Sequence, residues 1–234
     1  MEANAEIEEA LGKIEAEVAK GNYDLKGLGF WRLVGEVGRD PGLADRFAER
    51  IARVDRLAFE RWANFGLTAP VWLGNLLELA GALIGLGILL SALGKEGNIQ
   101  GIGLVVGAGI LMVTLHPLAH YAVGRALGIT FTRYFLDGPA KVQPSVKTDY
   151  ATYLRAAPLR RAAMHAAGAL ATKFVPILVL AKAVLVKAPG WSILVLVAIS
   201  LVVIATDILF STKIGDWKRV LREVRAHRES KKSI

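Results

Sequence analysis

Two histidines, His116 and His120, stand four residues apart in the apolar stretch LMVTLHPLAHYAVGRALGI, which runs from Leu111 to Ile129. Residues four apart lie on the same face of a helix, so both imidazoles can reach one ligand. The spacing suits two imidazoles on one metal ion, with a carboxylate from another segment as third ligand. Taken alone it is a weak signal, because two such histidines can also simply form hydrogen bonds with neighbouring helices.

Other ionisable residues in apolar segments are further candidates for the same chemistry. The chain has no cysteine, so a metal site must use histidine and carboxylate ligands. His165 and Asp207 are candidate ligands, because an ionisable side chain among apolar residues needs a compensating partner. Glu78 is expected at the depth of His116 and is a candidate catalytic base. A buried ion pair of Glu78 with Lys173 is the alternative.

Four long apolar segments must position these residues, and each is near or above the roughly 20 residues that a membrane-spanning helix needs. Hydrophobic residues make up 53% of the 234-residue chain, and its mean hydropathy is +0.41. The composition and the segments predict an all-α, polytopic membrane protein with four transmembrane helices in a domain over residues 67–212. The expected spans are residues 67–93, 99–127, 162–186 and 191–210.

Charged regions flank this domain. Residues 1–66 have apolar positions at helical spacing and predict two or three amphipathic helices on or near the membrane surface, with a solvated leader as the alternative. Residues 213–234 form a basic tail, and the polar link 128–161 predicts a short hairpin or a re-entrant segment.

The basic residues predict the orientation. Ten lysines and arginines lie in residues 1–66, six in 128–161 and eight in the tail, whereas each of the other two links holds one. This alternation predicts an integral plasma (inner) membrane protein with both termini cytoplasmic. The net charge of +8 is assigned to the cytoplasmic face and the lipid bilayer, and not to nucleic acid.

The sequence HPLAHYAVGRALGI resembles the first motif of the site-2 protease family of intramembrane zinc metalloproteases, His-Glu-x-x-His followed by a helix ending near Leu-Gly-Ile. The segment APLRRAAMHAAGALATKFVPILVLA is similar to the third-span motif of that family, a basic approach followed by Ala-Gly-Pro-x-x-Asn. The resemblance covers roughly Leu111 to Leu221. It implies a site-2-protease-like core that binds Zn²⁺ and a membrane-embedded protein or peptide as partner.

The chain departs from that pattern at the residues that do the chemistry. Pro117 stands at the place of the catalytic glutamate, and Ala169 and Thr172 replace the proline and asparagine of the third-span motif. In the family an aspartate is the third zinc ligand. By register Asp216, in GDWKRVL, matches it, whereas burial favours Asp207, so we rank Asp207 first and keep Asp216 in reserve.

Proline cannot take a proton from zinc-bound water, as the family glutamate does. We therefore expect a divergent, proteolytically inactive, intramembrane metal-binding protein. One alternative is an active metallohydrolase that uses Glu78 as its base. Another is a metal-independent membrane scaffold or small transporter, in which the polar residues line a path.

Overall fold

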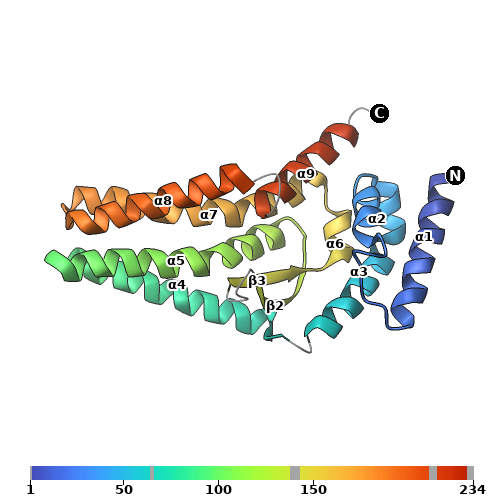
Figure 1. The fold of residues 1–234 in the computed structure, drawn as a ribbon, viewed down its shortest axis with the longest axis horizontal. Coiled ribbons are helices and arrows are strands. Elements are labelled where there is room, and N and C mark those ends of the chain that lie inside the picture. The colour runs from blue at the N-terminus through green and yellow to red at the C-terminus, as the bar shows by residue number, and fades with distance from the viewer. Residues whose placement is uncertain (1, 64–65, 138–142, 211–214, 231–234) are drawn as a thin grey trace.

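The computed structural model describes residues 2–63, 66–137, 143–210 and 215–230. Its elements form an elongated molecule, with the long helices side by side at one end and the shorter helices and strands at the other (Figure 1). Both termini lie at the end away from the long helices. The chain is mostly helical, as its sequence predicts.

The long helices are α4 (Val71–Leu93), α5 (Gly97–Ala126), α7 (Pro158–Leu185) and α8 (Gly190–Phe210). Within the described residues three of them, α4, α5 and α7, are long and apolar enough to cross a membrane. The apolar stretch Gly190–Thr206 of α8 is shorter. Helix length therefore supports three spans, and the expected fourth span stays a prediction. The helix bounds fall within about four residues of those expected from the apolar runs.

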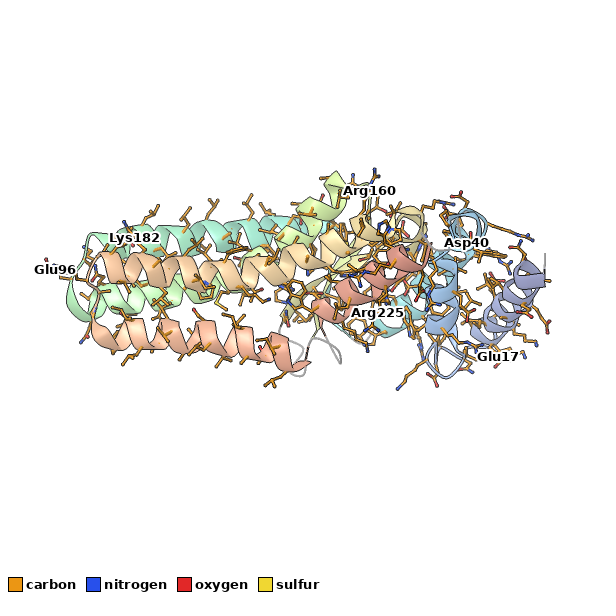
Figure 2. The ribbon with its side chains drawn as sticks, turned by 90° about the horizontal axis from the view of Figure 1, so that it is seen from above. Glu17, Asp40, Glu96, Arg160, Lys182 and Arg225 are labelled. Atoms are coloured by element: carbon orange, nitrogen blue, oxygen red, sulfur yellow. The ribbon has the colours of Figure 1, made fainter. Side chains whose placement is uncertain are left out.

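Large apolar side chains cover the outside of this bundle. Leu83 of α4, Leu178 of α7 and Leu201 of α8 are 62%, 64% and 60% exposed. Apolar surface on this scale needs an apolar environment to cover it. Figure 2 shows the charged residues Glu96 and Lys182 at the free end of the bundle, and Glu17, Asp40 and Arg225 toward the opposite end. The apolar bundle therefore lies between two polar ends.

Small residues let the helices of the bundle approach closely. A Cβ atom on Gly81 of α4 would lie 2.6 Å from Thr114 Cγ2 of α5, and one on Gly107 of α5 would lie 2.6 Å from Leu89 Cγ. Neither position has room for a larger side chain. The glycines spaced four apart, Gly81 with Gly85 on α4 and Gly103 with Gly107 on α5, thus serve close helix packing.

The N-terminal helices α1 (Glu2–Ala19), α2 (Phe30–Val37) and α3 (Pro41–Ala63) supply most of a second core, which Ile129 and, from α7, Met164 also enter. Their apolar faces are buried against one another, with Phe30, Phe47 and Ile51 almost fully enclosed. The short helix α6 (Tyr150–Arg155) joins this core through Tyr153 and Leu154. The apolar faces of the N-terminal helices, which we expected to lie on the membrane surface, are therefore at least partly buried inside the protein.

A small antiparallel sheet, ordered β1-β2-β3, is the main departure from the all-α expectation. It consists of β1 (Thr68–Pro70), β2 (Phe131–Asp137) and β3 (Gln143–Thr148), and β2 and β3 are the hairpin that the polar link 128–161 predicted as one of two options. The sequence analysis missed β1 because it has only three residues and pairs with β2 across the whole of α4 and α5. Helix α9 (Asp216–Ser230) follows α8 and packs along the start of α7.

Candidate metal centre

Helix α5 presents His116 and His120 on one face, toward α7. Their ring centroids are 4.7 Å apart, and counting back from Ala126 places them about 15 and 9 Å inside the end of the helix. Both side chains are largely buried. The pair predicted from the four-residue spacing is therefore directed into the protein and not toward the outside of the bundle.

The backbone of α7 fixes the ring of His120. Its Nδ1–H donates to the carbonyl oxygen of Met164 over 2.8 Å. The ring lies against Gly168, where a Cβ atom would fall 2.2 Å from Nε2 of His120. Because a carbonyl oxygen can only accept, the proton of a neutral His120 is on Nδ1 and the lone pair is on Nε2.

His116 is held in the same way. Its Nδ1 lies 3.0 Å from the carbonyl oxygen of Gly168 and 2.9 Å from Oγ1 of Thr172. The hydroxyl of Thr172 itself donates to the Gly168 carbonyl over 3.1 Å, so its oxygen is left to accept. The Nδ1 of His116 is therefore a donor, and its Nε2 carries a lone pair.

Asp216 brings the carboxylate. It is the first residue of α9 and follows Gly215, whose φ of +84° favours glycine. Its Oδ2 lies 3.1 Å from Nε2 of His120 and 3.5 Å from Nε2 of His116. Burial alone would raise the pKa of Asp216, but the neighbouring side chains of His120, His116 and Arg219 hold that pKa well below its usual range. The group is therefore ionised at neutral pH.

A buried ion pair sets the position of α9. Glu223 Oε2 lies 2.8 Å from Nε of Arg161 on α7, and both side chains are almost fully enclosed. Arg161 also donates through Nη2 to the carbonyl oxygen of Gly38 over 2.5 Å, and Tyr153 of α6 donates to Glu223 over 2.9 Å. These contacts tie α9 to α7, to α6 and to the N-terminal helices, so that Asp216 arrives at the histidines.

The three side chains face a small pocket of about 60 Å³. Strand β3 closes one side of it with Ser145, Val146 and Thr148. Among the described lining residues Asp216 is the one carboxylate, and Arg219, whose Nη1 lies 3.5 Å from Asp216 Oδ1, is the one arginine. A pocket of this size has room for an ion or a water molecule and not for a large ligand.

His116, His120 and Asp216 form a group that could hold a metal ion, because one donor atom from each lies within 4.8 Å of the others. Two of these residues were candidates of first choice, and Asp216 was the reserve that register favours. The side chain of Asp207 lies outside the described residues, so its rank stays a prediction. His165 lines the same pocket, with Nδ1 3.9 Å from Asp216 Oδ1.

Glu78 does not join this group. Thr114 marks the face of α5 that packs on α4, and His116 stands about 200° further around the helix. Glu78 of α4 is buried and lines a separate groove with Tyr134. The ion pair of Glu78 with Lys173 that we considered is not found among the described residues. Nζ of Lys173 donates to the Ala169 carbonyl and lies 5.1 Å from the ring centroid of Trp217.

The sequence analysis missed the residues that hold the histidines and α9 in place. Gly168 was read only as part of a family motif, and Arg161 only as part of its basic approach. Tyr153 and Glu223 lie in segments that carry no recognisable pattern. Only the depth of Arg161, beside an apolar run, could have signalled a buried partner.

No family model matches the chain, and no curated protein and no solved structure is detectably similar to it. Fold and site together define a mostly helical protein whose described residues include three helices long and apolar enough to cross a membrane and a His-His-Asp group able to hold a metal ion. The resemblance to the site-2 proteases rests on the quoted motifs alone.

Proposed function

We propose that this chain is an integral membrane protein that holds a divalent metal ion, zinc by the nature of its donors, between α5 and α9. The ion would be bound by Nε2 of His116, Nε2 of His120 and the carboxylate of Asp216. Its role would be structural: it would fix the start of α9 to the bundle, with no peptide hydrolysis.

One observation carries the proposal: two lone pairs face one carboxylate. Because both Nδ1–H groups are committed to carbonyl or hydroxyl oxygens of α7, neutral His116 and His120 turn acceptors toward Oδ2 of Asp216, at 3.5 and 3.1 Å. Acceptors at that separation repel unless a cation lies between them. A metal ion satisfies all three groups, whereas a single proton can bridge only one histidine to the oxygen.

The donor set favours zinc. Imidazole nitrogen and carboxylate oxygen bind Zn²⁺ at about 2.0–2.2 Å. Donors in a tetrahedral arrangement then lie about 3.3 Å apart, close to the two separations from Asp216 Oδ2. Magnesium and calcium prefer sites made of oxygen ligands and are disfavoured by two imidazoles.

The hydrogen bonds behind the ligands also support a metal site. Ligating histidines usually donate their other ring N–H to a carbonyl or carboxylate, which fixes the tautomer and the ring orientation. The carbonyl oxygens of Met164 and Gly168 supply this for His120 and His116.

Two features weigh against peptide hydrolysis. Pro117 occupies the position of the family glutamate, and no other carboxylate besides Asp216 is found among the described residues that line the pocket. Glu78, the alternative base, lies on the helix that packs against the opposite face of α5. A divergent, proteolytically inactive relative of the site-2 proteases accounts for both.

The membrane arrangement is part of the proposal. Helix α8 runs back along α7, and the two chain ends lie at the same end of the molecule (Figure 1). This course fits four spans with both termini on one side, the cytoplasmic side by the distribution of basic residues. The metal centre then lies in the cytoplasmic half of the bilayer.

Elemental analysis of the protein purified in mild detergent tests the function. We expect about one zinc ion per chain, because the ligands come from a single chain. His120→Ala should lose it, whereas His227→Ala should keep it, since His227 is the one histidine of four that does not line the pocket. Two results together would favour the metal-independent scaffold or transporter: a wild-type protein that contains no metal, and a His116→Ala variant that is as stable as the wild type.

A further inference from the structure

His165 of α7 lies in the same pocket as the α5 histidines, but its inward nitrogen has no partner. The residue is 6% exposed, and its Nδ1 is buried without a hydrogen bond among the described residues. The nearest charged group is Asp216, whose Oδ1 lies 3.9 Å away. A buried polar atom left unsatisfied in this way calls for an explanation.

The far side of the ring determines which nitrogen carries the proton. Nε2 of His165 lies 3.0 Å from the hydroxyl of Tyr153. That hydroxyl has one proton, and Glu223, paired with two arginines, can only accept it, over 2.9 Å. Nη2 of Arg222 donates to the hydroxyl oxygen of Tyr153 over 3.1 Å. The Tyr153 oxygen must therefore accept from His165, so Nε2 carries the proton and Nδ1 carries a lone pair.

All three histidines of the pocket thus share one arrangement. In each the outer nitrogen donates to a fixed acceptor: the Gly168 carbonyl with Thr172, the Met164 carbonyl and the Tyr153 hydroxyl, respectively. In each the inner nitrogen turns a lone pair toward the carboxylate of Asp216. The same arrangement occurs at three histidines from two helices, α5 and α7. This repetition favours a shared ligand over a chance placement of His165.

We propose that His165 is a further ligand of the metal ion, which completes a site of three imidazoles and one carboxylate. This inference rests on the proposed metal function. Its Nδ1 is the most distant donor, at 3.9 Å from Asp216 against about 3.3 Å for neighbouring donors in a tetrahedral zinc site. His165 lies outside the group of donors within 4.8 Å of one another, so the proposal requires its ring to move toward the other ligands when the ion binds.

The consequence concerns the fourth coordination position. A catalytic zinc site keeps one position for water, whereas a structural site fills all four with protein ligands. With His165 bound, the centre is closed. The ion then links α5, α7 and α9 at one point, and the missing glutamate at Pro117 has no water to act on.

The opposite role for His165 is that of a base, with its lone pair kept for a proton. A base stays off the metal, and its removal leaves metal affinity unchanged. A ligand is bound to the metal, and its removal weakens binding. The number of coordinated imidazoles therefore separates the two roles without any assay of activity.

X-ray absorption at the zinc edge of the full-length, zinc-loaded protein gives that number for the wild type. Three imidazoles with one carboxylate are expected, and two imidazoles with a water molecule would overturn the inference. Zinc competition with a chromogenic chelator gives the second readout. His165→Ala should bind zinc on the order of 100-fold more weakly, because losing a ligand should weaken binding at least as much as losing a hydrogen bond to a ligand. His227→Ala should bind zinc with the wild-type affinity.

The outcomes keep the two proposals apart. Wild-type affinity in His165→Ala, with zinc lost in His120→Ala, would overturn the fourth ligand and leave the proposed function standing. Absence of zinc from the wild type after loading would overturn both. If His165→Ala fails to fold, the imidazole count of the wild type alone decides the matter.

Discussion

The Nε2 atom of His120 lies 3.1 Å from Oδ2 of Asp216, although the two residues are 96 positions apart in the sequence. The other nitrogen of His120 is hydrogen-bonded to α7. One imidazole therefore connects the second apolar helix, the third and the helix that follows the fourth.

Replacing Asp216 with asparagine tests the need for the negative charge. Asp216→Asn keeps the shape of the side chain and removes the charge that balances the cation. We expect zinc affinity to fall on the order of 100-fold, because replacing a ligand should weaken metal binding at least as much as removing a residue that only hydrogen-bonds to a ligand. Competition with a chromogenic chelator measures this, with circular dichroism as the control for folding. Unchanged affinity would exclude Asp216 as a ligand.

Gly168→Ala should disturb the site without touching a ligand. The new methyl group would fall 2.2 Å from Nε2 of His120, the atom proposed to bind the metal, so the ring has to move. We expect zinc affinity to fall at least tenfold, as for other changes that misplace a ligand. The measurement is the same chelator competition.

Gly109→Ala is the matched control. A Cβ atom at Gly109 of α5 meets nothing within 4 Å, and alanine is favoured over glycine inside a helix by roughly 1 kcal/mol. This variant should bind zinc like the wild type and be equally or slightly more stable. If both variants bind zinc normally, the packing of His120 on Gly168 is not needed for the site.

The sequence predicted the pair His116 and His120 because helical spacing alone places residues four apart on one face. It also predicted the long helices, since their apolar runs are continuous. The choice between Asp207 and Asp216 was harder. Burial cannot be read from GDWKR, where Asp216 stands among polar residues, and only the tertiary packing of α9 on α7 encloses it. Register indicated Asp216, whose carboxylate reaches both histidines, and the rank of Asp207 stays a prediction.

The supporting residues could not be predicted for a related reason. Arg161 and Glu223 are ordinary surface residue types, and their pairing depends on a contact between helices 62 positions apart in the chain. Strand β1 has only three residues, and it forms a strand because it pairs with β2. Contacts of this kind are set by the fold as a whole and leave no local periodicity.

Glu223→Gln should destabilise the protein. It leaves the guanidinium of Arg161, which is 1% exposed, without its buried counter-charge. Breaking such a pair costs about 3–5 kcal/mol. We expect a lower unfolding temperature in detergent and weaker zinc binding, because α9 also carries Asp216.

Glu229→Gln on the same helix is the control for that change. Its partner is Arg39 at 3.5 Å, and both side chains are more than half exposed. Exposed pairs contribute about 0–1 kcal/mol, so this variant should unfold near the wild-type temperature. Equal destabilisation by the two substitutions would contradict the buried role of Glu223.

The pair of Asp55 and Lys147, 2.6 Å apart, joins α3 to β3 and gives the protein a pH dependence. Burial raises the pKa of Asp55, and the nearby Lys147 offsets this only in part. A raised pKa in the folded state means that the stability contribution is full below the ordinary value of about 3.9. That contribution is lost as pH rises through the raised pKa.

Comparison with Asp55→Asn isolates this group. Unfolding temperatures of both proteins, measured in detergent between about pH 3.5 and 7, should show the advantage of the wild type shrinking as pH rises from the ordinary carboxyl range. Above the raised pKa the difference should become constant. An advantage that grows with pH would show that the pair with Lys147 outweighs burial.

The central claim, that a cation lies between His120 and Asp216, is tested most directly by returning zinc to the chelator-stripped protein and following its unfolding temperature. We predict saturable binding of one ion per chain, with stabilisation of about 2.7 kcal/mol at a free zinc concentration 100 times the dissociation constant. His120→Ala should show no such rise, and His227→Ala should behave as the wild type. Equal unfolding temperatures of the wild type with and without zinc, across the same concentrations, would contradict the account.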